Sequence, residues 1–103
     1  MQKLIVFYTP IDTRENAKTL AKALVESRLI ACANIVAVDS VFRWDGVVQD
    51  TSEFVVIAKT TSDTAERVRA AINELHPYDV PCILSFAAES NPPFVAWVSG
   101  EVR

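Results

Sequence analysis

Hydrophobic and polar positions follow two different periods along this chain, and the period changes in a definite order. Residues 3–9 form a near-continuous apolar and β-branched run, which is typical of a strand buried on both faces. Pro10 ends that run. Within residues 12–27, a start that resembles a capping box is followed by apolar residues at every third or fourth position. This spacing predicts a strand followed by an amphipathic helix.

The middle of the chain predicts a long β-hairpin. From residue 30 to residue 44 apolar side chains fall on alternate positions, Asp45-Gly46 is a turn signal, and the return strand covers about residues 47–60. Each arm would hold about fourteen residues, whereas most strands hold five or six. A ribbon of this length has to bend or to extend beyond its own domain.

Helical spacing returns at residues 63–75, a fourth strand is expected at 81–88, and Asn91-Pro92-Pro93 favours a short last helix that ends near Gly100. The order β-α-β-β-α-β predicts an α+β, ferredoxin-like fold with one antiparallel sheet. The first and third strands would lie in its middle, and both main helices on one face. With 103 residues, we expect a single domain that spans 1–103.

Composition narrows the range of partners. Half of the residues are hydrophobic and 22% are charged, which favours a folded domain over disorder. A net charge of −3 and a pI near 5.0 argue against nucleic acid and anionic membranes as partners. No apolar run approaches the roughly 20 residues of a membrane span, and no charged leader precedes one. We therefore expect a cytoplasmic protein in which Cys32 and Cys82, on opposite sheet edges, stay thiols.

The overlong hairpin also predicts self-association. Phe42 and Trp44 would be exposed on a two-stranded ribbon, which is only marginally stable in water unless another subunit covers it. Contact between the edge of one chain and the edge of the next is heterologous, and it closes as a trimer or a small ring. We expect a homo-oligomer.

Candidate chemistry is concentrated at residues 76–82, where the only histidine, a phenol and a carboxylate lie between two prolines. His76, Asp79 and Cys82 offer imidazole, carboxylate and thiolate, a donor set that suits copper or zinc. Such a site could form within one chain or between subunits. The simpler interpretation is that Pro77 ends a helix and that His76 is a polar residue at the helix end.

Six short motifs of this chain together resemble the CutA divalent-cation tolerance proteins. They are YTP at 8–10, RLIACAN at 28–34, FRWDG at 42–46, KT at 59–60, HPYDVP at 76–81 and Trp97. The resemblance covers nearly the whole chain and implies a homotrimer with long interlocked strands. It also implies a role in the response to copper and other divalent metals. The fold is similar to that of PII signalling proteins, which implies pockets between subunits.

The chain departs from the family pattern at two positions that bear on metal binding. Some members carry a cysteine where this chain has Tyr8, and many carry an acidic residue where it has Cys82. The expected metal ligands are His76, Asp79, Cys82 and Cys32.

Two classes of function stay open. The first is a homotrimeric protein that binds or responds to divalent metal. The second is a PII-like trimer that holds a small anionic ligand between subunits, with four candidate binding residues: Lys59, Tyr78, Arg43 and Trp44. An enzyme is not expected, because the chain lacks CxxC, HExxH and GxSxG motifs and has only two glycines. No cofactor is required in either class.

Overall fold

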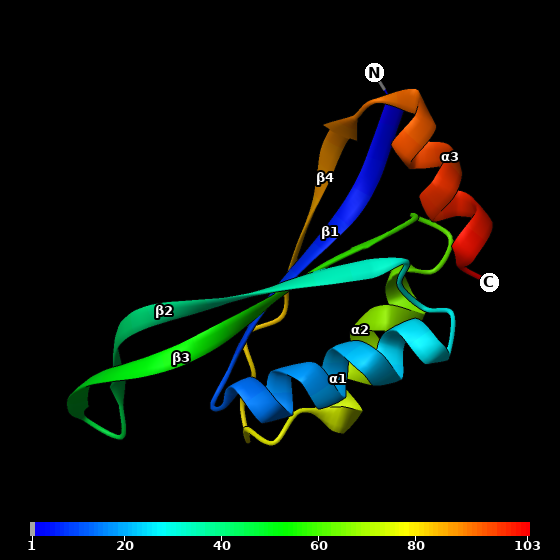
Figure 1. Ribbon diagram of the computed structural model, residues 1–103. Helices are drawn as coiled ribbons and strands as arrows, with labels where there is room; N and C mark the ends of the chain where they lie inside the picture. Colours follow the sequence, from blue (N-terminus) through cyan, green and yellow to red (C-terminus); the bar gives the residue numbers. More distant parts are fainter. Residues whose placement is uncertain (1) are drawn as a thin grey trace.

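The computed structural model describes residues 2–103, and its elements follow the predicted order (Figure 1). The elements are β1 (Gln2–Ile11), α1 (Arg14–Glu26), β2 (Cys32–Trp44), β3 (Val47–Thr60), α2 (Ala65–Leu75), β4 (Leu84–Ser90) and α3 (Pro92–Glu101). The four strands form one antiparallel sheet in the order β2-β3-β1-β4. The α+β, ferredoxin-like prediction is confirmed, with β1 and β3 in the middle and β2 and β4 at the edges.

Helix α1 begins as its sequence predicts. The Thr13 hydroxyl accepts a hydrogen bond from the backbone N–H of Asn16 at 3.0 Å, and the Asp12 carboxylate accepts one from the Thr13 N–H at 2.9 Å. These bonds satisfy amide groups that have no partner inside the helix.

The start of α2 lies later than the helical spacing from residue 63 predicts. The residue that precedes α2 is Thr64, and its hydroxyl bonds back to Thr60 and to the carbonyl of Thr61 instead of capping the helix. Helix α3 ends at Glu101, next to Gly100, as expected.

Helices α1 and α2 cover one face of the sheet, and the main core lies between these layers (Figure 1). Its fully buried side chains include Phe7 of β1, Val56 of β3, Leu24 of α1 and Ile72 of α2. Helix α3 packs through Val98 against Leu4, near the start of β1, in a second small cluster. No helix in residues 2–103 is long and apolar enough to cross a membrane.

The sheet face turned away from α1 and α2 carries exposed apolar side chains. Strand alternation places Tyr8 on the side opposite to Phe7, and Tyr8 is paired with Leu84 of β4. Leu84 is 54% exposed, its same-face neighbour Phe86 is 53% exposed, and Val36 of β2 is 42% exposed. A single chain therefore leaves much of this face uncovered.

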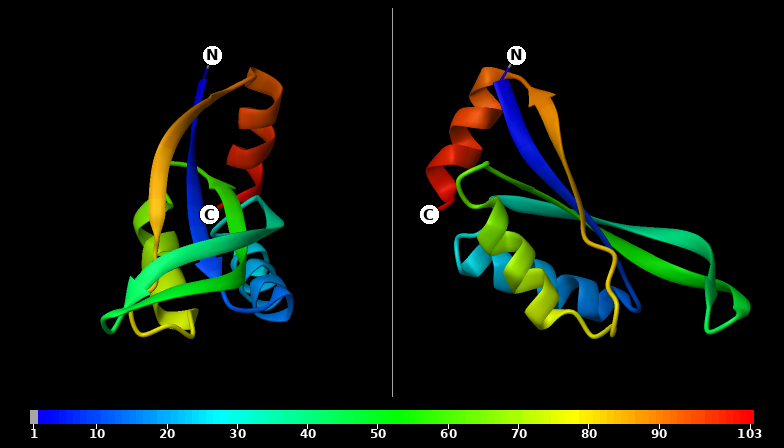
Figure 2. Two further views of the ribbon diagram at one scale, coloured as in Figure 1. Left: turned by 90° about the vertical axis from the view of Figure 1, so that its left-hand side faces the viewer. Right: turned by 180° about the vertical axis from the view of Figure 1, so that it is seen from behind.

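The predicted hairpin is present and extends beyond the rest of the domain (Figure 2). Strands β2 and β3 pair along their whole length, whereas β1 pairs with β3 only as far as Ile11 opposite Phe54. Beyond that point the sheet narrows to a two-stranded ribbon. Asp45 and Gly46 turn the chain with φ of 51° and 77°, as a tight two-residue hairpin turn requires. Phe42 and Trp44 on this ribbon are 41% and 52% exposed, as expected.

Candidate functional site

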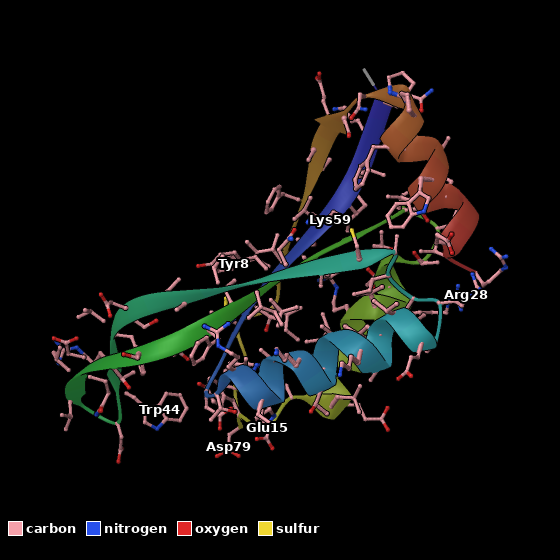
Figure 3. All side chains as sticks on the ribbon, in the orientation of Figure 1. Tyr8, Glu15, Arg28, Trp44, Lys59 and Asp79 are labelled. Carbon is pink, nitrogen blue, oxygen red and sulfur yellow. The ribbon has the colours of Figure 1, made fainter. Side chains whose placement is uncertain are left out.

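A cavity of about 790 Å³ lies between the overhanging ribbon and the loop that joins α2 to β4. The ribbon contributes Asp39, Phe42, Trp44 and Glu53, and the loop contributes Tyr78, Asp79 and Cys82. Figure 3 shows Trp44 and Asp79 below the hairpin, and the same cavity is lined by both residues. It is larger than a cavity of about 140 Å³ beside Pro77 and one of about 370 Å³ beside Thr61.

The loop is held in place by His76, which is only 7% exposed. Its backbone is extended, as the following proline requires, and its N–H still bonds to Ile72 at the end of α2. The ring Nε2 donates to the carbonyl of Pro10 at 2.8 Å, and Nδ1 accepts from the N–H of Tyr78 at 3.1 Å. Because a carbonyl can only accept and an N–H can only donate, these contacts define a neutral imidazole that carries its proton on Nε2. His76 thus fastens the loop to the end of β1.

Tyr78 connects the loop to the ribbon. Its hydroxyl donates to the Glu53 carboxylate at 2.6 Å, a short bond of the kind made to a charged acceptor. Burial, this hydrogen bond and the negative charge of Glu53 raise the pKa of Tyr78 well above its ordinary value. The phenol therefore stays protonated and acts as a hydrogen-bond donor.

The cavity is electronegative. Its lining contains the carboxylates of Asp39, Glu53 and Asp79 but no lysine or arginine. Within residues 2–103 the ion pairs are Arg28 with Glu101 and Arg69 with Glu66, and neither involves the cavity. Glu53 is 7% exposed, so its charge is the most deeply buried of the three. A cation is favoured in this space and an anion is disfavoured.

The structure brings together four of the residues predicted from the sequence and separates the others. The lining of the cavity includes Trp44, Tyr78, Asp79 and Cys82. His76 is not part of the lining, but its ring contacts that of Tyr78 with 4.7 Å between centroids.

Lys59, Arg43 and Cys32 lie outside the cavity. Lys59 is paired with Cys32 at the end of the hairpin opposite to its turn, and it bonds to the side chain of Asn34. Burial raises the pKa of the Cys32 thiol, and the charge of Lys59 opposes that shift. Arg43 is on the ribbon, opposite Val48, but does not line the cavity. Lys59 therefore does not line the cavity with Tyr78 and Trp44, and Figure 3 shows it well away from Trp44.

No three histidine, cysteine or acidic side chains converge closely enough to bind a metal ion within residues 2–103. A three-ligand site made by His76, Asp79 and Cys82 of one chain is therefore not formed in this conformation. Asp79 and Cys82 share the cavity, whereas both ring nitrogens of His76 are already hydrogen-bonded. A site shared between subunits stays a prediction.

Sequence reasoning missed two of the acidic residues, Asp39 and Glu53. For Glu53 a signal was present, since it has the same strand phase as the buried Val55. A carboxylate at a strand position that alternates with buried apolar residues indicates either a buried hydrogen-bond partner or a functional site, and here Tyr78 is the partner.

Comparison with known proteins agrees with the motifs. Residues 5–101 match the family model of the CutA1 divalent ion tolerance protein. The divalent-cation tolerance protein CutA of Thermus thermophilus is 38% identical over 100 residues, which cover 95% of each chain. These relatives are named as tolerance proteins and not as enzymes.

Two solved structures are similar over almost their whole length. The crystal structure of CutA1 from Pyrococcus horikoshii has a TM-score of 0.93 and 34% identity, over 96% of this chain and 98% of that one. The PII-like protein CutA from Nostoc has a TM-score of 0.90 and 28% identity, over 96% and 97% of the two chains. With a family match that extends from residue 5 to residue 101, the chain belongs to the CutA1 divalent ion tolerance family.

Proposed function

We propose that this protein serves divalent-cation tolerance as a homotrimer that binds the metal ion, copper in particular, at sites completed between subunits. The observation that carries the proposal is the electronegative cavity, in which Asp79 and Cys82 are two potential metal ligands on one loop. A carboxylate and a thiolate are two of the four ligands that a four-coordinate copper or zinc site uses. The remaining ligands would come from a second subunit.

The uncovered surfaces support assembly. Leu84 and Phe86 on the open sheet face, together with Trp44 on the ribbon, are each about half exposed. Apolar side chains gathered on one face of a folded chain usually mark an interaction surface. Among residues 2–103 no strand pairs with the outer side of β2 or β4, and edge strands are sites where a second chain can pair.

A copper titration with matched variants tests the metal proposal. Calorimetry would compare the wild type with Asp79→Asn/Cys82→Ser, which removes both cavity ligands. Asp50→Asn is the control, because Asp50 is an exposed carboxylate on the same hairpin that does not line the cavity. We expect the double variant to lose about tenfold or more in copper affinity, as loss of direct ligands does, and the control to keep its affinity. Equal affinity for all three proteins would remove this loop from metal binding.

The second candidate function is a PII-like trimer that senses a small ligand. The specific observation in its favour is the size of the cavity, which is far larger than a metal ion needs and lies in the range of small-molecule sites. The Nostoc relative is itself described as PII-like. An anionic ligand would have to be held by Lys59 or Arg43 of another subunit, because the cavity of one chain contains no cation. Mass spectrometry of protein purified without added ligand would identify what it retains.

A further inference from the structure

A second cavity, of about 370 Å³, lies at the end of the sheet opposite to the ribbon, where β3 leads into α2. Three cations line it: Lys3 near the start of β1, Arg67 of α2, and Arg103 after α3. The lining also contains four hydroxyl groups, those of Thr61, Ser62, Thr64 and Ser99. Acidic residues outnumber basic ones in the whole chain by 13 to 10, so this lining reverses the general balance of charge.

The two guanidinium groups are held by main-chain oxygens. Arg67 donates to the main-chain oxygen of Arg103, and Arg103 donates to the carbonyls of Gly100 and Val102, each at 2.9 Å. The tail is itself fixed, because the N–H of Arg103 bonds to the carbonyl of Arg28 at 2.9 Å and Val102 is 7% exposed. A guanidinium has five N–H donors, so both groups keep donors for a ligand. The two arginines are therefore positioned before any ligand binds.

Nearby acidic groups do not neutralise the three cations. Asp63 is the one carboxylate side chain in the lining, and neither ion pair in the described residues involves Lys3, Arg67 or Arg103. Glu89 is the cross-strand neighbour of Lys3, but it makes no ion pair with it among residues 2–103 and does not line the cavity. With a carboxylate also counted at Arg103, where the given sequence ends, three positive charges still face two negative ones.

From this arrangement we infer that the cavity binds a phosphate group, free or as the monoester of a small molecule, through Lys3, Arg67 and Arg103. The planar fork of an arginine matches two phosphate oxygens at once, and a lysine adds a point charge. Hydroxyl groups in the lining can donate to the oxygens that remain. The volume of about 370 Å³ lies in the range of small-molecule sites, so it leaves room for an organic group beside the phosphate.

This site is separate from the surfaces proposed for assembly and from the acidic cavity. Its lining comes from the start of β1, the segment between β3 and α2, the first turn of α2, and the end of α3 with the tail. None of these residues belongs to the ribbon or to the edge strands β2 and β4. The inference therefore goes beyond the proposed function and does not depend on it.

The experiment follows two probes, inorganic phosphate and glycerol 3-phosphate, by phosphorus NMR as protein is added. The assembled protein is first treated with a chelator and dialysed, so that bound metal does not contribute. Titrations are made at constant ionic strength and at pH ~8, where a phosphomonoester carries close to two negative charges. Glycerol, followed by proton NMR, is the neutral control. We expect a saturable change in the phosphorus signal and no saturable change with glycerol.

Three variants, each without one positive charge, test the residues that carry the inference. Arg67→Gln should weaken binding of the phosphate probe by about tenfold, and Lys3→Gln by about fivefold. Lys22→Gln is the matched control, because Lys22 is an exposed lysine of α1 that does not line the cavity, and it should change binding by less than about twofold. If Arg67→Gln fails to fold by circular dichroism, Lys3→Gln carries the test.

Binding of glycerol 3-phosphate would support a monoester as the ligand, and binding of inorganic phosphate alone would support the free ion. Three results would overturn the inference: no saturable signal change with either probe, unchanged affinity in the folded Arg67→Gln and Lys3→Gln variants, or an equal loss in Lys22→Gln. Copper affinity is measured separately with the Asp79→Asn/Cys82→Ser variant, so failure of this inference and failure of the metal proposal are distinguishable.

Discussion

Removing the Tyr78 hydroxyl should destabilise the protein more than its small size suggests. In Tyr78→Phe the ring is retained, and only the donor to Glu53 is lost. Glu53 is 7% exposed, so its charge would stay buried without that bond. A hydrogen bond to a charged acceptor contributes about 1.5–3 kcal/mol, and an acceptor left unsatisfied costs about as much. We expect a loss of roughly 1.5–3 kcal/mol in the free energy of unfolding.

The double variant Tyr78→Phe/Glu53→Leu should recover most of that loss. Replacing both partners by apolar groups of similar size removes the buried charge together with its donor, which is often close to neutral. Guanidinium unfolding at one fixed protein concentration measures the four corners of this cycle. Tyr8→Phe is the control, since Tyr8 lies on the open sheet face and its hydroxyl has no hydrogen bond within residues 2–103. A loss below about 0.5 kcal/mol in Tyr78→Phe would refute the reasoning.

The same bond predicts a pH dependence. The pKa of Tyr78 is raised in the folded state, so the phenol contributes stability that is fully present below the ordinary tyrosine pKa of about 10 and is lost as pH rises further. Wild type should therefore lose stability above pH ~10 more steeply than Tyr78→Phe. Absorbance of the tyrosinate should show one tyrosine that ionises late, and that late step should be absent from the variant.

Three further outcomes are expected. Deleting residues 41–49 and closing the shortened hairpin should abolish the proposed trimer before it alters the circular dichroism spectrum, and light scattering that shows the same trimer for this variant as for the wild type would contradict this. N-ethylmaleimide should modify Cys82 before Cys32, because Cys82 is exposed whereas burial raises the pKa of Cys32; peptide mass mapping with the reverse order would disprove it. Thr13→Ala should cost about 1 kcal/mol through loss of the cap of α1, measured by thermal unfolding against Thr19→Ala as the exposed mid-helix control.

Most of the fold could be predicted because its signals are local. The turn at Asp45-Gly46 needs positive φ at both positions, and aspartate followed by glycine is the pair that tolerates this. The Thr13 cap and the period of the hydrophobic residues likewise depend on neighbours in sequence. The start of α2 was misplaced because the Thr64 hydroxyl has two partners in the preceding residues, Thr60 and Thr61, and does not cap the helix. Competition of that kind depends on how β3 ends and is not visible in the sequence spacing.

The site was harder to predict, because it depends on which end of a long strand each residue occupies. Lys59 and Glu53 are on the same strand, six positions apart, and at ~3.3 Å per residue this separates them by about 20 Å. Grouping Lys59 with Tyr78 assigned to the cavity a cation that lies at the opposite end of β3, where β3 still pairs with β1. The residue that does reach Tyr78 is Glu53. Its carboxylate gives the cavity a negative charge in place of the positive charge that Lys59 would have supplied.

The negative charge beside Tyr78 is explained by the position at which β1 ends. Because β1 stops opposite Phe54, residue 53 is the first position of β3 beyond the three-stranded part of the sheet. His76 holds the loop after α2 there by its bond to Pro10, so Tyr78 meets Glu53 at the junction between sheet and ribbon. A carboxylate at that junction is buried by the loop and still lines the cavity. The histidine motif therefore shapes this site by positioning Tyr78, and the chemistry of the cavity is determined by the acidic and aromatic residues of the ribbon.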